Sequence, residues 1–380
     1  MHVDTQLEAA LRALDHWPRF RLRLFFEGIV VGILSGTVIS FFRWGLEMGT
    51  VWRQWIYANV LASGGVLLNL SWFGVLLAAA LLLWRLGIYE PNAGGSGIPQ
   101  VKGVILRILW VKLVGGIVGI GLGLSLGREG PSIQIGAVTA QGLSRALGRT
   151  RMEERYLITA GASAGLAAAF NAPLAGVMFA LEELHRNFSG VVLAPSMAAA
   201  LLATMVSRYV FGRAPVFHFG MLPPFPLRYM WLVVILGIII GLAGVVFNKG
   251  LLNIHYFYDL PVFRNNYMRI AFALCMAGIL GYVFPEVLGG GNDLVNSLYT
   301  LPLSLKLFAG LLIGKFLFTL VSYGCGVPGG FFLPMLVLGA LTGGITGIVF
   351  VRLGLISSYY LSNIVVISMA AFFAASVQSP

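Results

Sequence analysis

Apolar stretches of about 20 residues recur along the whole chain, and they constrain its fold more than any other feature. A helix of that length crosses the hydrocarbon core of a bilayer. Hydrophobic residues make up 58% of the 380 residues and charged residues only 10%, whereas a soluble domain has about 25% charged residues. The sequence therefore predicts an all-α polytopic membrane protein that forms a single bundle rather than a string of soluble domains.

Basic residues give the chain a formal net charge of +11. In a soluble protein this excess would suggest nucleic-acid binding, but here the charges gather in short connections beside apolar stretches, as the positive-inside rule describes. Two clusters stand out: Arg12, Arg19, Arg21 and Arg23, and then Arg145, Arg149, Arg151 and Arg155. We therefore expect a multi-pass protein of the cell inner (plasma) membrane with a cytoplasmic N-terminus, a lipid bilayer around it and no nucleic-acid partner.

The few cysteines and histidines point to neither a disulfide nor a metal site. Cys275 and Cys325 both lie in apolar stretches, and His185, His218 and His255 lie near the ends of spans without a metal-ligand spacing. We expect no cofactor, no metal and no enzymatic activity.

Two similar halves follow a short N-terminal segment. Within residues 1–20, Leu7, Leu11 and Leu14 share one helical face, which predicts an amphipathic helix on the cytoplasmic surface. A polar connection, 212–228, separates a first membrane repeat, 21–212, from a second, 229–380. Glycine-rich interruptions occur at corresponding places in both halves, which is typical of transporters built from repeats.

The segment Gly127-Arg128-Glu129-Gly130-Pro131 places two charges between long apolar stretches. Charges in hydrocarbon cost a few kcal/mol each, and backbone broken by glycine and proline is tolerated at membrane depth only where it lines a cavity or is buried in protein. We interpret this segment as the place where an ion passes, with Glu129 controlling its passage.

Three interruptions end in the start of a new helix, at Ser96, Glu129 and Phe331. Helix N-termini present unpaired amide groups, so their convergence would bind an anion without a full positive charge in contact. The Glu129 carboxylate could occupy the same place and leave it on protonation, which would couple proton and anion movement. Glu183 follows a short apolar segment, 174–181, and could deliver protons from the cytoplasm.

Structural interpretations compete with these roles. Glu129 could form a buried bridge with Arg128 or Lys112, Arg128 could brace loops, and Ser96 could be a plain helix cap. Glu182 and Glu183 could be solvated at the membrane surface. Lys112 and Lys315 are expected to snorkel or to neutralise buried acids.

These motifs, from about Phe25 to the end of the sequence, resemble the CLC family of chloride channels and chloride/proton antiporters. The resemblance implies an inverted-repeat bundle of tilted and broken helices, with Glu129 as the gating glutamate and Glu183 as the internal proton-transfer residue. It implies anion contacts from the following residues: Ser96, Gly97, Ile98, Arg128, Gly130, Phe331 and Phe332.

Within the family, an acid at Glu183 favours a chloride/proton antiporter over a passive, voltage-gated type of chloride channel, which stays the alternative. Ser96 resembles chloride-preferring members, although other small anions stay possible. The resemblance also implies a homodimer, with 191–206 contributing to its interface, and no cytoplasmic nucleotide-binding module is expected.

One departure concerns the end of the sequence. The family continues past the position of Gln378, and a tyrosine on its last helix contacts the central anion. Tyr359 and Tyr360 lie too early to replace it, so we expect either a truncated sequence or an anion site that lacks one wall.

A remote alternative of a different class is an intramembrane serine protease, because Gly94-Gly95-Ser96-Gly97 fits a Gly-x-Ser-Gly pattern. A nucleophilic serine needs a base within reach, and no histidine lies within an apolar span.

Overall fold

A computed structural model describes the chain except for residues 1, 62–63, 96–104, 186–188, 215, 218, 220–221, 299–303 and 378–380, and except for the side chains of 2–19 and 105. Its described part is almost entirely helical and contains no β-strand, only an isolated bridge between Gly127 and Gly330. The predicted all-α class is confirmed.

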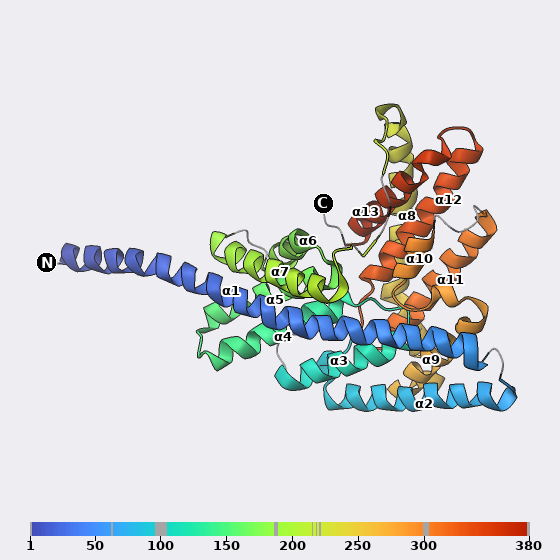
Figure 1. Cartoon of the computed structure of the whole chain (residues 1–380), viewed down its shortest axis with the longest axis horizontal. Coiled ribbons are helices and arrows are strands. Elements are labelled where there is room, and N and C mark those ends of the chain that lie inside the picture. Colours follow the sequence, from blue (N-terminus) through green and yellow to red (C-terminus); the bar gives the residue numbers. More distant parts are fainter. Residues whose placement is uncertain are drawn as a thin grey trace. The chain divides into compact units, whose positions relative to one another are not determined.

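The helices vary widely in length (Figure 1). Their bounds are α1 His2–Trp55, α2 Val66–Tyr89, α3 Ile105–Gly121, α4 Glu129–Ala146, α5 Arg151–Phe170, α6 Pro173–Phe179, α7 Gly190–Phe211, α8 Met230–Tyr258, α9 Asn266–Val283, α10 Asn292–Ser297, α11 Leu305–Gly324, α12 Phe332–Arg352 and α13 Leu361–Val377. Within the described residues, eight helices are long and apolar enough to cross a membrane.

Short turns join or extend these helices. In the described part of the chain, two are π-helical, Ile56–Leu61 and Ala180–His185, and five are 3-10 turns: Pro91–Ala93, Leu227–Tyr229, Pro261–Phe263, Pro285–Val287 and Ser358–Tyr360. The N-terminal stretch is helical as expected, but it continues without a break into the first span as part of α1.

The chain forms two compact units. Unit 1 comprises Met1–Arg43, Ile98–Trp110 and Ser132–Pro215, and unit 2 comprises Trp44–Gly97, Val111–Pro131 and Val216–Pro380. The chain passes between the units within α1, α3 and α4.

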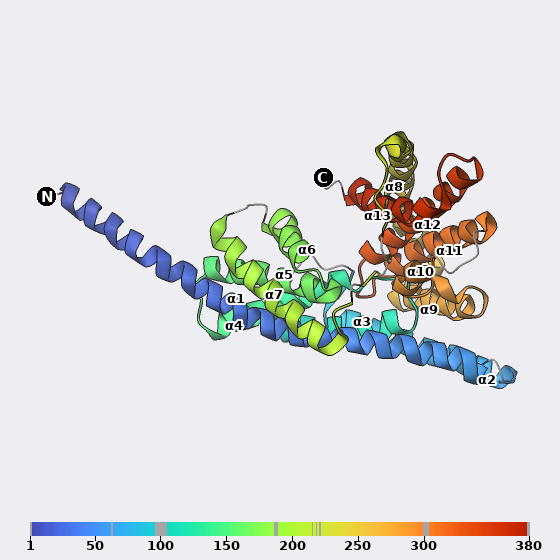
Figure 2. The ribbon, with the colours of Figure 1, turned by 45° about the horizontal axis from the view of Figure 1, so that its top comes forward.

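In unit 1, small residues let helices approach closely. Gly28, Gly32 and Gly36 recur every four residues on α1 and face α7, where a Cβ atom at Gly28 would lie only 2.6 Å from the carbonyl oxygen of Pro195. A Cβ atom at Gly36 would lie 2.7 Å from the Cα of Ala203. Helix α7 also packs along α5 and α6, as Figures 1 and 2 show. This is the small-residue packing typical of membrane helices.

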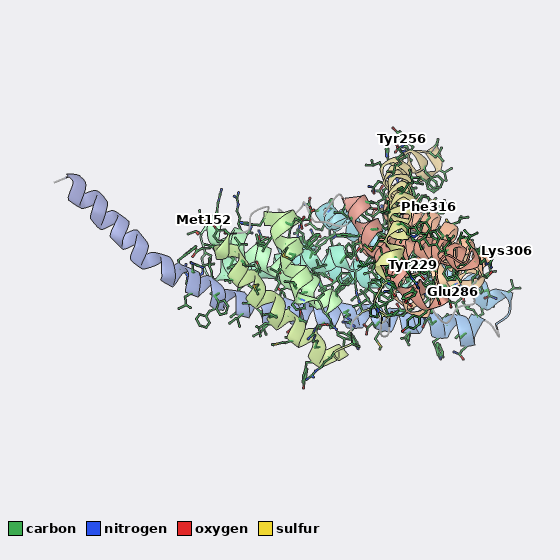
Figure 3. The ribbon with its side chains drawn as sticks, turned by 90° about the horizontal axis from the view of Figure 1, so that it is seen from above. Met152, Tyr229, Tyr256, Glu286, Lys306 and Phe316 are labelled. Atoms are coloured by element: carbon green, nitrogen blue, oxygen red, sulfur yellow. The ribbon has the colours of Figure 1, made fainter. Side chains whose placement is uncertain are left out.

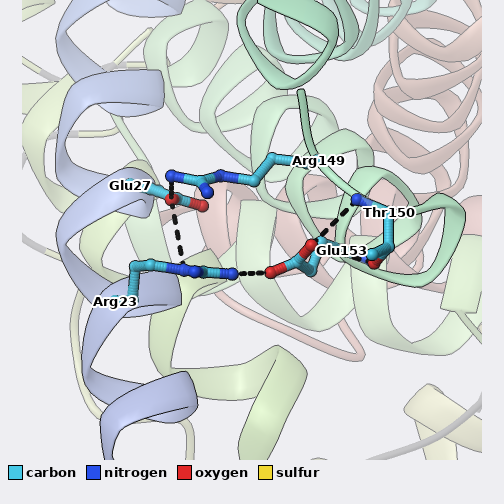
Figure 4. Close-up of polar contacts among 5 residues, drawn as sticks. All are labelled: Arg23, Glu27, Arg149, Thr150 and Glu153. Atoms are coloured by element: carbon cyan, nitrogen blue, oxygen red, sulfur yellow. Dashed lines mark hydrogen bonds and ion pairs between the residues drawn. The ribbon is translucent and has the colours of Figure 1, made fainter. Parts of the chain in front are cut away.

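An ionic network ties the basic connection before α5 to α1 within unit 1 (Figure 4). Arg23 bonds the Glu153 carboxylate, and Nη2 of Arg149 lies 2.5 Å from Oε1 of Glu27. Glu153 and Thr150 form a capping box at the start of α5, because Oε2 of Glu153 accepts the Thr150 backbone N–H at 2.8 Å. Both carboxylates are buried, so the second arginine cluster is partly neutralised by carboxylates of its own unit.

In unit 2, α12 lies against α8, α11 and α13 (Figures 1 and 2). Their shared core includes Leu236, Phe247, Leu338 and Phe372. Gly119 lets α3 approach the loop before α12 closely, since a Cβ atom there would lie 2.7 Å from the Val327 side chain. The loop before α12 is thereby held against α3.

Candidate functional site

Two glycine loops of unit 2 pair at the start of α4 and of α12. The N–H of Gly127 donates to the carbonyl of Gly330 at 2.6 Å, and the N–H of Gly330 donates back to Gly127 at 2.9 Å. Side chains would not fit here, because a Cβ atom at Gly127 would lie 2.5 Å from Cδ of Glu129, and one at Gly330 would lie 3.0 Å from it. The pairing brings two helix N-termini together, as the sequence predicts.

The third predicted loop joins them. The N–H of Gly329 donates to the carbonyl of Gly95 at 3.3 Å, so the loop that leads to residue 96 lies against the loop before α12. Ser96, Gly97 and Ile98 fall outside the described residues, and their predicted contacts with an anion stay predictions.

Glu129 occupies the place that these loops enclose. It is the first residue of α4, only 4% exposed, and its Oε1 accepts the N–H of Phe332 at 2.7 Å and that of Leu333 at 3.3 Å. These amides open α12, where N–H groups lack intrahelical partners and the helix dipole favours negative charge. Within the described part of the chain, Oε2 makes no hydrogen bond. The carboxylate therefore lies where a helix N-terminus would hold a free anion.

The buried bridge considered for Glu129 and Lys112 is not formed. Lys112 is fully buried, and its Nζ donates to the carbonyl of Gly95 at 2.6 Å. Lys315 is equally buried and donates to the carbonyls of Val287 and Gly289, at 2.9 and 2.6 Å. The expectation that the two lysines snorkel or neutralise acids is wrong, because loop carbonyls hold both ammonium groups.

Arg128 is 8% exposed, and its Nη1 lies 4.0 Å from Oε1 of Glu47 on α1. This ion pair is compatible with a bracing role. Direct anion binding by Arg128 and by the Gly130 amide stays a prediction. The Gly130 nitrogen lies beside Gly330, since a Cβ atom there would be 3.2 Å from it.

Aromatic contacts fix the start of α12. The Phe331 ring stands edge-on to Tyr323 with ring centroids 5.3 Å apart, and the Phe332 ring stands edge-on to Phe373 at 5.0 Å. Both side chains are therefore engaged in packing, which leaves their backbone as the part that can serve an anion.

Small polar side chains on α11 support the loop before α4, and none of the sequence motifs above includes them. The Ser125 N–H donates to Oγ of Ser322 at 3.0 Å, and Oγ of Ser125 lies 2.8 Å from Oγ1 of Thr319. A serine three residues after a threonine on an apolar helix was the available signal, because residues at that spacing share a face.

Glu183 lies in unit 1, half-buried in the π-helical turn Ala180–His185 that follows the seven-residue helix α6. The expected short segment with acids at its end is therefore present, and a π-helical turn is frequent at functional sites. His185 shares this turn, with its Nδ1 3.5 Å from Oγ1 of Thr159. Burial, and then the charge of Arg155, lower the pKa of His185.

Comparisons with known proteins agree with this arrangement. The family model described as "Voltage gated chloride channel" matches residues 74–380. The chain is 32% identical to the H(+)/Cl(-) exchange transporter ClcA of Vibrio vulnificus (strain YJ016), over 94% of this chain and 80% of the relative. It is 33% identical to the transporter of the same name from Salmonella agona (strain SL483), over 97% and 81%.

Solved structures show the same fold. A slow cyanobacterial Cl⁻/H⁺ antiporter superposes with a TM-score of 0.86 at 30% identity, covering 93% of this chain and 85% of that one. A CLC-type fluoride/proton antiporter superposes with a TM-score of 0.76 at 23% identity, over 94% and 87%, which supports the fold alone. The chain is therefore a multi-pass membrane protein that belongs to the CLC family of voltage-gated chloride channels and their transporter relatives.

Proposed function

We propose that the protein exchanges chloride for protons across a membrane, with Glu129 as the gate. The observation that carries the proposal is the pair of hydrogen bonds from the Phe332 and Leu333 amides to Oε1 of Glu129. The names of the relatives, an H(+)/Cl(-) exchange transporter and a Cl⁻/H⁺ antiporter, support the same activity.

The mechanism is a competition for the amides that open α12. An ionised Glu129 carboxylate occupies them and excludes an anion of the same charge. A proton removes that charge, the neutral carboxyl group leaves, and a chloride ion takes its hydrogen bonds. Chloride then leaves toward one side of the membrane and the proton leaves toward the other. The ionised carboxylate of Glu129 returns to the amides that open α12. Because each exchange of occupant needs a proton, the two fluxes move in opposite directions.

Release is as important as binding in such a site. Backbone amides stabilise an anion without placing a full positive charge in contact with it, so the ion is held weakly enough to leave. The described contacts of Lys112 fit this requirement, since its ammonium group bonds the Gly95 carbonyl and not the Glu129 carboxylate, which occupies the Phe332 and Leu333 amides.

Further residues receive roles on the same reasoning. Glu183 transfers protons on the cytoplasmic side, and Ser96, Gly97 and Ile98 complete the anion path with Phe331 and Phe332. Arg128 and Gly130, on either side of Glu129 in the sequence, also contribute to anion binding. The membrane core consists of two repeats, 21–212 and 229–380, preceded by a cytoplasmic amphipathic helical segment over residues 1–20.

We also place the protein in the cell inner membrane as a homodimer with cytoplasmic N-termini. Exposed apolar side chains on α7 support an interface there, because Met197, Leu201 and Met205 lie at four-residue spacing and are 42%, 43% and 61% exposed. Such a stripe faces either lipid or a second copy of the chain.

The experiment is a liposome assay in which an outward chloride gradient drives proton uptake. The parent protein is expected to acidify the vesicle interior. Glu129→Ala is expected to keep chloride flux and lose proton movement, and Glu183→Gln is expected to lose proton movement as well. Glu286→Gln is the control, because Glu286 is exposed on a turn of unit 2, the unit that holds Glu129 (Figure 3).

Each result separates the possibilities. Chloride flux without proton movement in the parent protein would instead indicate a passive channel. Proton coupling that persists in Glu129→Ala would contradict the proposed gate.

A further inference from the structure

Arg53 is a buried cation that has no role in the chloride/proton mechanism described above. It lies in the last turn of α1, within unit 2, and is only 6% exposed. Among the residues that the structure describes, it forms no hydrogen bond and no ion pair, and its Nη1 is buried without a partner. Burying a charge in this way is costly, so such a residue in a membrane protein calls for a functional explanation.

Two glycines make room for the guanidinium group. A Cβ atom at Gly123 would lie 2.6 Å from Nη1 of Arg53, and one at Gly289 would lie 3.9 Å from it. Both glycines have left-handed backbone, with φ of 113° and 66°. The Gly289 N–H donates to the Gly123 carbonyl at 2.9 Å, which joins the two segments. Arg53 is thus seated where the loop before α4 meets the loop before α10.

A second buried basic side chain, Lys315 on α11, contacts the same loop. Nζ of Lys315 donates to the Gly289 carbonyl at 2.6 Å, and a Cβ atom at Gly291 would lie 3.3 Å from that nitrogen. No carboxylate among the described residues forms an ion pair with Arg53 or Lys315. Asp293, exposed at the start of α10, attracts Arg53 electrostatically without pairing with it. The loop 289–291 therefore lies against Arg53, whose charge no carboxylate among the described residues pairs directly.

This loop reaches the segments that hold the Glu129 carboxylate. A Cβ atom at Gly290 would lie 3.2 Å from the Leu333 side chain and 3.5 Å from the Leu126 carbonyl oxygen. Leu333 provides one of the amides that bond Glu129, and Leu126 lies three residues before Glu129. The charge of Arg53 is accordingly placed near the amides that open α12, but it does not contact the Glu129 carboxylate that occupies them.

We propose that Arg53 is a positioning residue for the transported anion, whose unpaired charge draws the anion to the α12 amides and raises its affinity there. The inference rests on the proposed function and adds the source of the attraction. The amides alone bind weakly, and a fixed cation at a distance strengthens binding without forming a contact that must break on release. A unit charge roughly 10 Å away, at an effective dielectric constant of about 20, changes an anion's affinity about tenfold.

The test measures chloride binding to the detergent-solubilised protein by titration calorimetry, at fixed pH and ionic strength. Arg53→Met is expected to weaken binding about tenfold, and Arg53→Lys, which keeps the charge, is expected to bind within about twofold of the parent. Asp293→Asn removes the opposing charge and is expected to strengthen binding a few-fold. A purely structural role for Arg53 would not produce these opposite shifts.

Asp293→Asn still tests the proposal if Arg53→Met does not fold, because Asp293 is exposed and an exposed side chain tolerates substitution. Unchanged chloride affinity in Asp293→Asn, or equal weakening by Arg53→Met and Arg53→Lys, would overturn the proposal. Calorimetry needs no proton movement, so a failure of proton coupling in liposomes refutes the antiport mechanism without deciding the role of Arg53.

Discussion

Oε1 of Glu129 lies 2.7 Å from the backbone nitrogen of Phe332, although 203 residues separate the two along the chain. A carboxylate is thereby placed on the amide groups that a bound anion would use. Four features keep it there: the pairing of Gly127 with Gly330, the bond of Gly329 to Gly95, the contacts of Ser125 with one serine and one threonine of α11, and the aromatic packing of Phe331. The gate is a consequence of how these loops are fixed.

Gly330 tests whether the carboxylate needs this space. In Gly330→Ala the new Cβ atom would lie 3.0 Å from Cδ of Glu129, so the carboxyl group is expected to be displaced. Chloride-driven proton uptake in liposomes should then fall at least tenfold, since one misplaced group near the reacting ions disrupts the competition. Gly237→Ala on α8 is the control, because nothing lies within 4 Å of its added carbon. Equal activity in the two variants would argue against close packing between Gly330 and the Glu129 carboxyl group.

Lys112 tests the support of the Gly95 loop. Lys112→Met removes the donor to the Gly95 carbonyl and is expected to lower the free energy of unfolding by about 1–3 kcal/mol, the cost of leaving a buried polar group unsatisfied. Denaturation in detergent, followed by the loss of helical circular dichroism, measures this change. Lys306→Met provides the comparison, since Lys306 is exposed (Figure 3). A destabilisation no larger than that of the control would show that the bond is not needed.

The capping box of α5 tests the organisation of unit 1. Thr150→Ala removes a side-chain oxygen that accepts the Glu153 N–H, and loss of such a cap costs about 1 kcal/mol. Ser189→Ala at the start of α7 should cost much less, because Ser189 makes no side-chain capping bond. Thermal unfolding of the two variants side by side measures the difference, and equal melting temperatures would contradict it.

His185 gives a prediction for pH. Burial, followed by the charge of Arg155, lowers the pKa of His185 in the folded protein below its ordinary value of 6.5. The unfolded state therefore binds more protons at mildly acidic pH, so the contribution of this residue to stability is present above pH 6.5 and is lost as pH falls toward the folded pKa. His185→Gln should flatten the acid side of the curve of stability against pH. An unchanged curve would exclude this contribution.

Much of the site was predictable from residue types. Glycines around an Arg–Glu pair at membrane depth indicated broken helices, and the starts at Glu129 and Phe331 do meet. These predictions succeed because an ionisable residue and broken backbone are tolerated inside a membrane only under narrow conditions.

The partners of the buried cations were not predictable. Lys112 and Lys315 bond carbonyls of Gly95 and Gly289, and a sequence does not show which loop carbonyls the fold leaves unpaired. Arg53 resembled an ordinary charge at the end of a span, and only the structure places it between Gly123 and Gly289. In each case the packing of loops that are far apart in the sequence decides the contact, and the local sequence pattern does not predict it.

The most direct test of the competition at Glu129 is chloride binding measured by calorimetry as a function of pH. In the parent protein, chloride affinity should rise as pH falls, because protonation releases the carboxylate from the amides of Phe332 and Leu333. Glu129→Gln, which is neutral at every pH, should bind chloride tightly throughout with no such dependence. If the parent protein and Glu129→Gln show the same affinity and the same pH profile, the carboxylate does not compete with the anion and the account is wrong.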